Sequence, residues 1–496
     1  MRFCDEGKLS VLILALYLAL AAAYAWLTPL WQAPDEPAHF NNIAYIATTG
    51  HLPVLQAGDY DQEYLEELKA RRFPPELSIS SVRYEGHQPP LYYLLMAPVL
   101  WLLQGAGMRT TIWVLRLLNV LVGAGVIFFI WLGVRRLFPR RPYLALLAAG
   151  FVAFLPMHIA MSASINNDAL AEFFIAAVMV QLLDILQEDE PGLEKWYSVG
   201  LLMGLGLLTK FQAYILIPLA GVVWLWQLAR AWRAHRLSSR TWWSGAALAL
   251  PALLLPLPWW LRNWRIYGPM DIFGLERHNA VVVGQPRTVD WIATQGWGPY
   301  LHRFVTFTFR SFWGVFGWMG VFMDARVYLL LTLLSLLLLV GVLYQLWRWR
   351  QGRIHLTAGQ KRGLVLLALQ LALVVAAYLW YNLDFVQHQG RYLFPALLPL
   401  SLLAAVGLMG LLSPTGSRVG AVAAALALAA WALAGLRGHD VNAWALAMAG
   451  GAMLAMVARA WLRLGKTWCW ALLVEGMMAL VAIYALFGAI LPQLGG

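Results

Sequence analysis

Long apolar runs alternate with short polar stretches along most of the chain. A helix that spans a bilayer needs about 20 mostly apolar residues, because the hydrocarbon core is roughly 30 Å thick. This criterion predicts about thirteen spanning helices, at residues 9–30, 111–134, 143–160, 168–187, 197–210, 211–229, 241–261, 327–347, 363–382, 393–412, 419–436, 441–462 and 469–491. Since backbone amides at membrane depth must be paired within a helix, we predict an all-α integral membrane bundle.

A further apolar segment, residues 89–104, is shorter than the others. Loops rich in Lys and Arg mark the cytoplasmic side of a membrane protein. Three such loops are evident, carrying Arg230, Arg233, Arg236 and Arg240, then Arg348, Arg350, Arg353, Lys361 and Arg362, and finally Arg463 and Lys466. The basic cluster between Arg135 and Arg141 reaches the same side only if residues 89–104 do not cross. We therefore expect a re-entrant or half-length helix there.

Two long polar stretches are expected outside the membrane. Residues 31–88 carry nine acids against four bases and follow a first helix flanked by basic residues, which places the N-terminus in the cytoplasm. Within this stretch, apolar spacing predicts a short amphipathic helix from Pro37 to Gly50 and another at about 60–72, capped by Asp59 or Asp61. Residues 262–326 are expected to lie across the outer end of the bundle.

These segments suggest three parts: an N-terminal transmembrane module (1–262) that includes the outer stretch 31–88, an outer loop (263–326) and a C-terminal transmembrane module (327–496). For the first helix, a secretory signal peptide over residues 1–25 is the alternative, because Ala23-Tyr24-Ala25 resembles a cleavage site. Asp5 and Glu6 argue against it, since they spoil the basic start that such peptides have.

Composition excludes several other classes of protein. With 61% hydrophobic residues, 12% charged residues and a mean hydropathy of +0.64, the chain is not a set of soluble domains. The net charge of +11 is explained by cytoplasmic loops, so no nucleic-acid partner is expected. Only two cysteines, Cys4 and Cys469, are present, which excludes a disulfide framework and a cysteine-based metal site.

Polar residues beside membrane helices are costly and point to a functional site. In the predicted topology such residues gather at the outer ends of the helices: Asp35, Glu36, Asn166, Asn167, Asp168, Lys210, Arg262, His388 and Arg391. Carboxylates beside cations suit a reaction in which an acid deprotonates an acceptor while the cations stabilise a departing phosphate. We expect the apolar surroundings to raise the basicity of the carboxylate.

Simpler explanations exist for each of these residues. Asp35 could be only the N-cap of the helix that starts at Pro37, and Lys210 and Arg262 could extend to the interface without a ligand. The D-x-D spacing of Asp59-Tyr60-Asp61 is found at metal-bound nucleotides, although helix capping explains it more simply. His39 and His87 could bind a metal with Asp35, but a single histidine near a membrane is more often a hydrogen-bonding group.

Several short motifs occur in a characteristic order. They are Pro34-Asp35-Glu36-Pro37-Ala38-His39-Phe40, Gly86-His87-Gln88-Pro89-Pro90-Leu91-Tyr92-Tyr93, Asn167-Asp168-Ala169-Leu170, Leu208-Thr209-Lys210, Arg262-Asn263-Trp264 and Gln389-Gly390-Arg391-Tyr392-Leu393-Phe394-Pro395. In these motifs and their order, from about residue 9 to 412, the chain resembles the GT-C superfamily of membrane glycosyltransferases. The resemblance is greatest to its protein O-mannosyltransferase-like and lipid A aminoarabinose transferase-like branch of bacterial membrane transferases.

The resemblance implies a polyprenyl-phosphate-linked sugar as donor, an acceptor on the outer face of the cytoplasmic membrane and inversion at the anomeric carbon. Asp35 matches the family's catalytic acid, with Glu36 as its neighbour; the positions that match donor-phosphate groups are Lys210, Arg262, His388 and Arg391. Substrate contacts are expected from His39, His87, Asn167 and Asp168. His87 departs from the lysine that relatives often carry there, which leaves a phosphate role for it in doubt.

The combined prediction is a glycosyltransferase of the inner membrane whose active site faces outward and whose general base is Asp35. No cofactor is required, and a divalent metal remains an option, because Arg391, Lys210 and Arg262 can neutralise a monophosphate. A transporter or lipid-sugar flippase is the first alternative, since it also needs polar groups inside a helical bundle. A scaffold for an envelope biosynthetic complex is the second.

Overall fold

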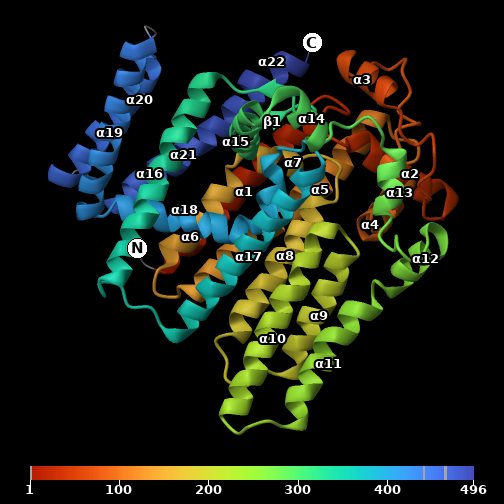
Figure 1. Cartoon of the computed structure of the whole chain (residues 1–496), viewed down its shortest axis with the longest axis horizontal. Coiled ribbons are helices and arrows are strands. Elements are labelled where there is room, and N and C mark those ends of the chain that lie inside the picture. The colour runs from red at the N-terminus through yellow and green to blue at the C-terminus, as the bar shows by residue number, and fades with distance from the viewer. Residues whose placement is uncertain (1–2, 439–441, 463–465, 496) are drawn as a thin grey trace.

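The computed structural model describes residues 3–438, 442–462 and 466–495, so the predicted cytoplasmic residue Arg463 lies outside the described residues. The fold is an α-helical bundle, as predicted (Figure 1). Its strands are β1 (Val315–Phe316) and β2 (Val321–Phe322), which pair antiparallel. The length and apolar character of the helices identify an integral membrane protein.

Within the described residues, nine helices are long and apolar enough to cross a membrane. They are α1 (Phe3–Leu27), α5 (Met108–Leu137), α10 (Leu216–Arg233) with the preceding η2 (Phe211–Ile215), α16 (Ala325–Arg350), α17 (Ala358–Asp384), α18 (Leu397–Leu411) with η3 (Gly390–Ala396), α19 (Pro414–Gly438), α20 (Ala443–Trp461), and α21 (Thr467–Tyr484) continued by η4 (Ala485–Ile490) and α22 (Leu491–Leu494). Two bent helix pairs raise the number to as many as eleven: α6 (Pro142–Ala153) with α7 (Pro156–Ser162), and α11 (Ser239–Leu254) with α12 (Leu257–Tyr267).

The predicted count of about thirteen spans is therefore not reached. The other two predicted segments form α8 (Asp168–Ile185), which contains three acids, and α9 (Leu193–Leu207), which has only 15 residues. Residues 89–104 form the 12-residue helix α4 (Leu91–Leu102). A 12-residue helix is about 18 Å long and cannot cross the hydrocarbon core, so the prediction of a half-length helix is confirmed.

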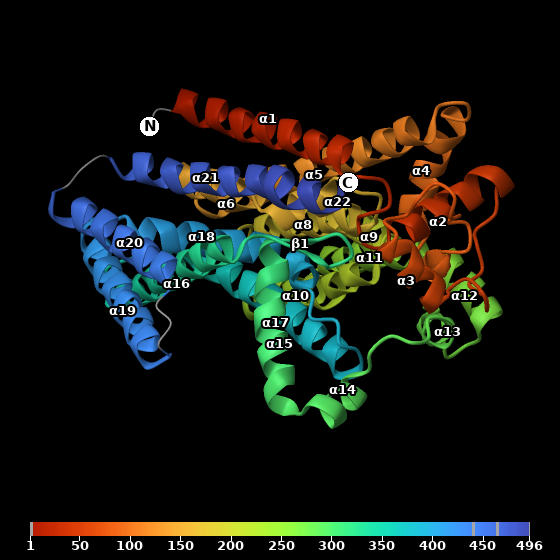
Figure 2. The same cartoon turned by 90° about the horizontal axis from the view of Figure 1, so that it is seen from above.

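The two ends of the chain pack together in the bundle. α1 runs beside α21 (Figure 2), and the Tyr24 hydroxyl of α1 donates a 2.6 Å hydrogen bond to the carbonyl of Ala482 in α21. Tyr17 and Ala21 of α1 are also fully buried in the main core. By contrast, α19 and α20 form a hairpin at the side of the bundle (Figures 1 and 2).

The first outer stretch forms the two short helices that the sequence predicts. α2 (Glu36–Thr49) has Pro37 in its first turn, where a missing N–H is harmless, and ends at Gly50, whose φ of 71° suits glycine. α3 (Gln62–Ala70) begins where Asp61 accepts a hydrogen bond from the Tyr64 amide at 3.0 Å. Together with η1 (Tyr84–His87) and α4, these elements gather at one end of the molecule (Figure 2).

The second outer stretch contains α13 (Leu275–Val281), α14 (Thr288–Gln295) and α15 (Trp297–Trp313). α15 packs directly on η3, and the contact is so close that a side chain on Gly390 would lie 2.3 Å from the Thr308 carbonyl oxygen. The Gly390 amide also donates to the Ser311 hydroxyl at 2.8 Å. The outer helix α15 therefore fixes the backbone immediately before Arg391.

Candidate active site around Asp35

Asp35 occupies a tight turn between α1 and α2. Its φ of 64° is left-handed, a conformation that aspartate tolerates better than most residues, and its side chain does not cap α2. Instead, Oδ1 accepts a 2.8 Å hydrogen bond from the Tyr84 hydroxyl, and Oδ2 accepts one of 3.1 Å from Arg391. The side chain of Asp35 is 29% exposed, so it is paired but still accessible.

Arg391 lies between two carboxylates. Its guanidinium bonds Asp35 on one side and lies 3.6 Å from Asp168 Oδ2 on the other. Its Nε donates to Gln389 Oε1 at 2.7 Å, which fixes the orientation of the guanidinium plane. The side chain is only 6% exposed. A buried cation of this kind is strongly held by its partners and can present its remaining N–H groups to a ligand.

Asp168 also pairs with Lys210. The two charged atoms lie 2.5 Å apart, and Lys210 Nζ donates to Asn167 Oδ1 at 2.9 Å. Asn167 in turn donates to the Thr209 carbonyl at 3.0 Å, which ties the start of α8 to the turn after α9. Lys210 is therefore held in place by an ion pair and does not simply extend to the interface.

Asp35, Arg391, Asp168 and Lys210 form a row of alternating charges, which we name the Asp35 cluster. Burial by itself raises the pKa of Asp35, but the nearby Arg391, His39 and the Tyr84 hydrogen bond outweigh it and lower the pKa below its ordinary value. The expectation that apolar surroundings raise the basicity of this acid is therefore wrong for the unliganded site. The reason is that Arg391 lies within hydrogen-bond distance.

His39 and Glu85 lie beside the Asp35 cluster. His39 Nδ1 is 2.8 Å from the Tyr93 hydroxyl, and burial lowers the pKa of His39, which favours the neutral imidazole. Burial raises the pKa of Glu85, whose Oε2 has no hydrogen-bond partner. The sequence analysis missed both Tyr84 and Glu85; the available signal was an acid two positions before His87, inside the acidic outer stretch.

Glu36 points away from the Asp35 cluster into the protein. It is fully buried and binds Arg116 of α5 through two hydrogen bonds of 2.7 Å. Arg116 also donates to the carbonyl groups of Ala25, Thr28 and Pro29 at the end of α1. The structure therefore separates Glu36 from Asp35. Arg116 was also missed, although a lone cation within the apolar run 111–134 is the kind of residue that requires a partner.

Three other predicted site residues lie outside the Asp35 cluster. Arg262 donates to the carbonyl oxygens of Leu52 and Pro53, at 3.2 and 2.6 Å. His388 packs edge-on against Tyr300 and Phe304, and burial lowers its pKa to about 4, so it is neutral at pH 7. His87 contacts the ring of His278 on α13, with ring centroids 4.4 Å apart.

Within the part of the chain that the structure describes, no group of three or more His, Cys, Asp or Glu side chains could hold a metal ion. Asp59 and Asp61 do not act together, because Asp61 caps α3 while Asp59 pairs with Arg83 at 2.8 Å. Whether a divalent metal takes part therefore stays a prediction.

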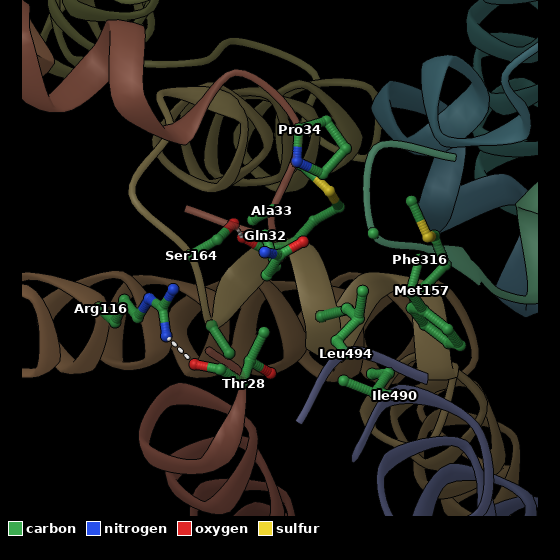
Figure 3. A pocket seen from close by; sticks show the side chains of 14 residues that line it. Thr28, Gln32, Ala33, Pro34, Arg116, Met157, Ser164, Phe316, Ile490 and Leu494 are labelled. Carbon is green, nitrogen blue, oxygen red and sulfur yellow. Dashed lines mark hydrogen bonds between the residues drawn. The ribbon is translucent and has the colours of Figure 1, made fainter. Parts of the chain in front are cut away.

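A small cavity lies directly behind the turn that carries Asp35 (Figure 3). Its lining includes Gln32 and Pro34 from the turn, Met157 from α7 and Leu494 from the C-terminal helix. The volume is about 30 Å³, the space of about one water molecule. Gln32 Nε2 is buried there without a hydrogen-bond partner, which suits such a water.

The chain is similar to known proteins in part of its sequence and in its fold. Residues 87–260 match the family model described as dolichyl-phosphate-mannose-protein mannosyltransferase. Among solved structures, ArnT from Cupriavidus metallidurans in the apo state matches with a TM-score of 0.52 and 19% identity, over 96% of this chain and 76% of ArnT. The same protein bound to undecaprenyl phosphate matches with a TM-score of 0.51 and 18% identity, over the same shares. No curated protein matches the sequence.

The matched family region contains His87, Asn167, Asp168 and Lys210, while Asp35 and Arg391 lie outside it. The structural match extends over 96% of the chain. The resemblance to the GT-C superfamily is thus supported by a family model over residues 87–260 and by the fold: this chain has a membrane fold similar to that of ArnT.

Proposed function

We propose that this protein transfers a sugar from a polyprenyl-phosphate-linked donor to an acceptor on the outer face of the cytoplasmic membrane, with inversion at the anomeric carbon. The observation that carries the proposal is the Asp35 cluster, in which a partly exposed carboxylate lies 3.1 Å from a buried arginine at one end of a GT-C-type bundle. The structural relative ArnT binds undecaprenyl phosphate, a lipid carrier of the proposed class.

In this mechanism Asp35 is the general base. Its carboxylate accepts the proton of the acceptor hydroxyl while the hydroxyl oxygen attacks the anomeric carbon. The bond from that carbon to the phosphate oxygen breaks, and its electron pair leaves with the polyprenyl phosphate. Arg391 and Lys210 stabilise the charge on this leaving group, and Asp168 holds both cations in position.

Donor binding also adjusts the strength of the base. In the unliganded site the pKa of Asp35 is lowered because, although burial raises it, Arg391 and His39 favour the charged carboxylate. A donor phosphate that engages Arg391 competes for the same cation, so Asp35 becomes a stronger base only when the donor is present. The base is therefore strengthened in the donor complex and stays weak in the free enzyme.

The other predicted residues take supporting roles in this proposal. His39, beside Asp35, is placed to contact the sugar, and Asn167 orients Lys210. Glu36 acts through the turn that carries Asp35 and does not contact the substrate. A metal is not required, because the two cations of the Asp35 cluster balance a phosphate monoanion or dianion.

Mass spectrometry of envelope glycans tests the proposal directly. Cells that lack the gene are expected to lose one sugar substituent, and the wild-type gene restores it whereas Asp35→Asn does not. Asp61→Asn is a matched control, since asparagine also caps a helix and Asp61 lies in the same outer stretch. An unchanged glycan profile would reject the transferase. Translocation of a sugar lipid without a new glycosidic bond would support a flippase.

A further inference from the structure

A second, polar cavity lies against η1, the short helix whose Tyr84 bonds Asp35. It has a volume of about 110 Å³ and is lined by α2, the turn at residues 53–59 and η1; the polar lining residues are Asn41, Asn42, Gln56, Asp59 and Arg83. Tyr45, which is 36% exposed, stands at its edge. The volume equals that of about four water molecules, which is enough for the hydroxyl-bearing edge of a sugar ring.

Asn42, one of the lining residues of this cavity, has an unsatisfied hydrogen-bond acceptor. Its Nδ2 donates to the Glu85 carbonyl at 3.0 Å, which fixes the amide group. Its Oδ1 is buried and has no hydrogen-bond partner, although the residue is only 5% exposed. A buried carbonyl oxygen without a donor is unfavourable, so Asn42 has a hydrogen-bonding capacity that the protein itself does not satisfy.

The charges in the cavity cancel each other. Asp59 and Arg83 form an ion pair of 2.8 Å, and Asp59 Oδ2 also accepts from the Gln56 amide at 2.9 Å. The pair therefore has no net charge to attract a metal ion or an anion, although the Arg83 side chain is 44% exposed. Neutral amide groups and an aromatic ring remain, and this combination suits an uncharged polyhydroxylated ligand.

The second outer loop holds the opposite side of the cavity. Arg262 donates to the Leu52 and Pro53 carbonyls, and Arg277 Nε donates to the Leu55 carbonyl at 3.0 Å. The Leu55 amide donates to the Tyr267 hydroxyl at 3.0 Å. Arg262 is thus a positioning residue for this cavity, since its guanidinium is engaged with the turn that lines it.

η1 connects the cavity to the Asp35 cluster. Its first residue, Tyr84, bonds Asp35; the carbonyl of its second, Glu85, accepts from Asn42; and its third, Gly86, lines the cavity. We infer that this cavity binds a neutral saccharide unit of the acceptor and holds it next to the reactive carboxylate. The inference rests on the proposed function, and it identifies the acceptor as a glycan or glycolipid.

Binding can be tested without turnover. Purified full-length protein in lipid nanodiscs is mixed with maltotriose, chitotriose or mannotriose, three uncharged oligosaccharides, and binding is measured by saturation-transfer difference NMR. We expect saturation of at least one of them. Tyr45→Ala, at an exposed position, and Gln56→Ala should weaken binding about tenfold together, because they remove an aromatic face and an amide. Thr49→Ala, an exposed change on the same helix outside the cavity, should leave binding unchanged.

The outcomes separate this inference from the proposed function. Asp35→Asn should retain saccharide binding while it loses transfer. No saturation from any of the three probes, equal saturation in the Tyr45→Ala/Gln56→Ala variant, or displacement of the probe by inorganic phosphate would overturn the saccharide site, and the transferase would stand. Binding that persists in a protein with no transferase activity would reject the proposed function and leave the site in place.

Discussion

Asp35 and Glu36 are adjacent in sequence, but they lie in two different kinds of charged site. Each oxygen of Glu36 accepts two hydrogen bonds: Oε1 from Arg116 and the Ile165 amide, and Oε2 from Arg116 and the Trp31 amide. Each oxygen of Asp35 accepts only one, and 29% of its side chain is exposed. The carboxylate of Glu36 is saturated, whereas that of Asp35 has free lone pairs.

This difference shows how one short motif serves two purposes. A buried carboxylate with every lone pair satisfied is fixed in position, and here it joins α1, α5 and the start of α8 around the turn. A carboxylate with free lone pairs can accept a proton from a substrate. Glu36 thereby holds the turn that presents Asp35, and the two acids should respond to mutation in opposite ways.

The largest effect is expected from Asp35→Asn. Removal of the base should reduce transfer by about 10²–10⁴-fold, the usual contribution of a general base, while the apparent Tm stays near that of the wild type. Activity is measured in reconstituted membranes with a polyprenyl-phosphate-linked sugar, and Tm by intrinsic fluorescence. Undiminished turnover would remove Asp35 from the mechanism, and a collapse of Tm would assign it to the same structural class as Glu36.

Arg116→Ala should have the opposite effect, with a loss of protein stability as its primary result. It leaves Glu36 buried without its cation and frees the carbonyls at the end of α1, which should destabilise the fold by about 3–5 kcal/mol. We expect loss of monodisperse protein on size-exclusion chromatography. Arg109→Ala is the matched control, because Arg109 is an exposed arginine on the same helix. A stable but inactive Arg116→Ala protein would contradict the structural role.

The local sequence pattern was sufficient to predict the short helices α2 and α3 but not the ion pairs. Proline, glycine and apolar spacing located α2 and α3, because these signals act within one or two turns. The count of thirteen spans is not confirmed, since an apolar window does not register the acids of α8 or the early end of α9. The half-length α4 was found from the charge balance of distant loops.

The Asp35 cluster was only partly predictable. The cost of charge at a membrane pointed to Asp35, Asp168, Lys210 and Arg391, and the structure brings all four together. The partners of Glu36 and Arg262, and the direction of the Asp35 pKa, depend on contacts between residues 80 to 356 positions apart. Contacts between residues so far apart produce no regular spacing of residue types in the sequence, so only the fold reveals them.

Arg391→Gln sharpens the contrast by removing the cation that Asp35 shares. Transfer should fall about 10²–10³-fold, the effect of losing one charge-stabilising donor. Because Arg391 lowers the Asp35 pKa against the opposing effect of burial, its removal should raise that pKa and move the acid limb of kcat/KM to higher pH. Arg391→Lys keeps the charge and should keep the acid limb near its wild-type position. An unchanged limb in Arg391→Gln would show that another group is the base.

The smallest effect is expected at the contact of His87 with His278, which joins the two outer loops. Burial lowers the pKa of both imidazoles, and His278 lowers the pKa of His87 further, so both are neutral in the folded protein at pH 7. For a histidine whose folded pKa is depressed, stability is complete above the ordinary pKa of about 6.5 and declines as pH falls below it. The apparent Tm should therefore decrease between pH 7 and pH 5.

His87→Phe keeps an aromatic ring at this contact but cannot be protonated, so it should reduce that decrease by about 1 kcal/mol in the free energy of unfolding. His51→Phe, at an exposed histidine of the same outer stretch, should leave the decrease unchanged. Part of the decrease should persist in His87→Phe, because burial also lowers the pKa of His39 beside Asp35. If the wild type, His87→Phe and His51→Phe show equal pH dependence of Tm, the imidazoles of the His87 contact are not protonated on acidification. The loss of stability would then arise from the Asp35 cluster.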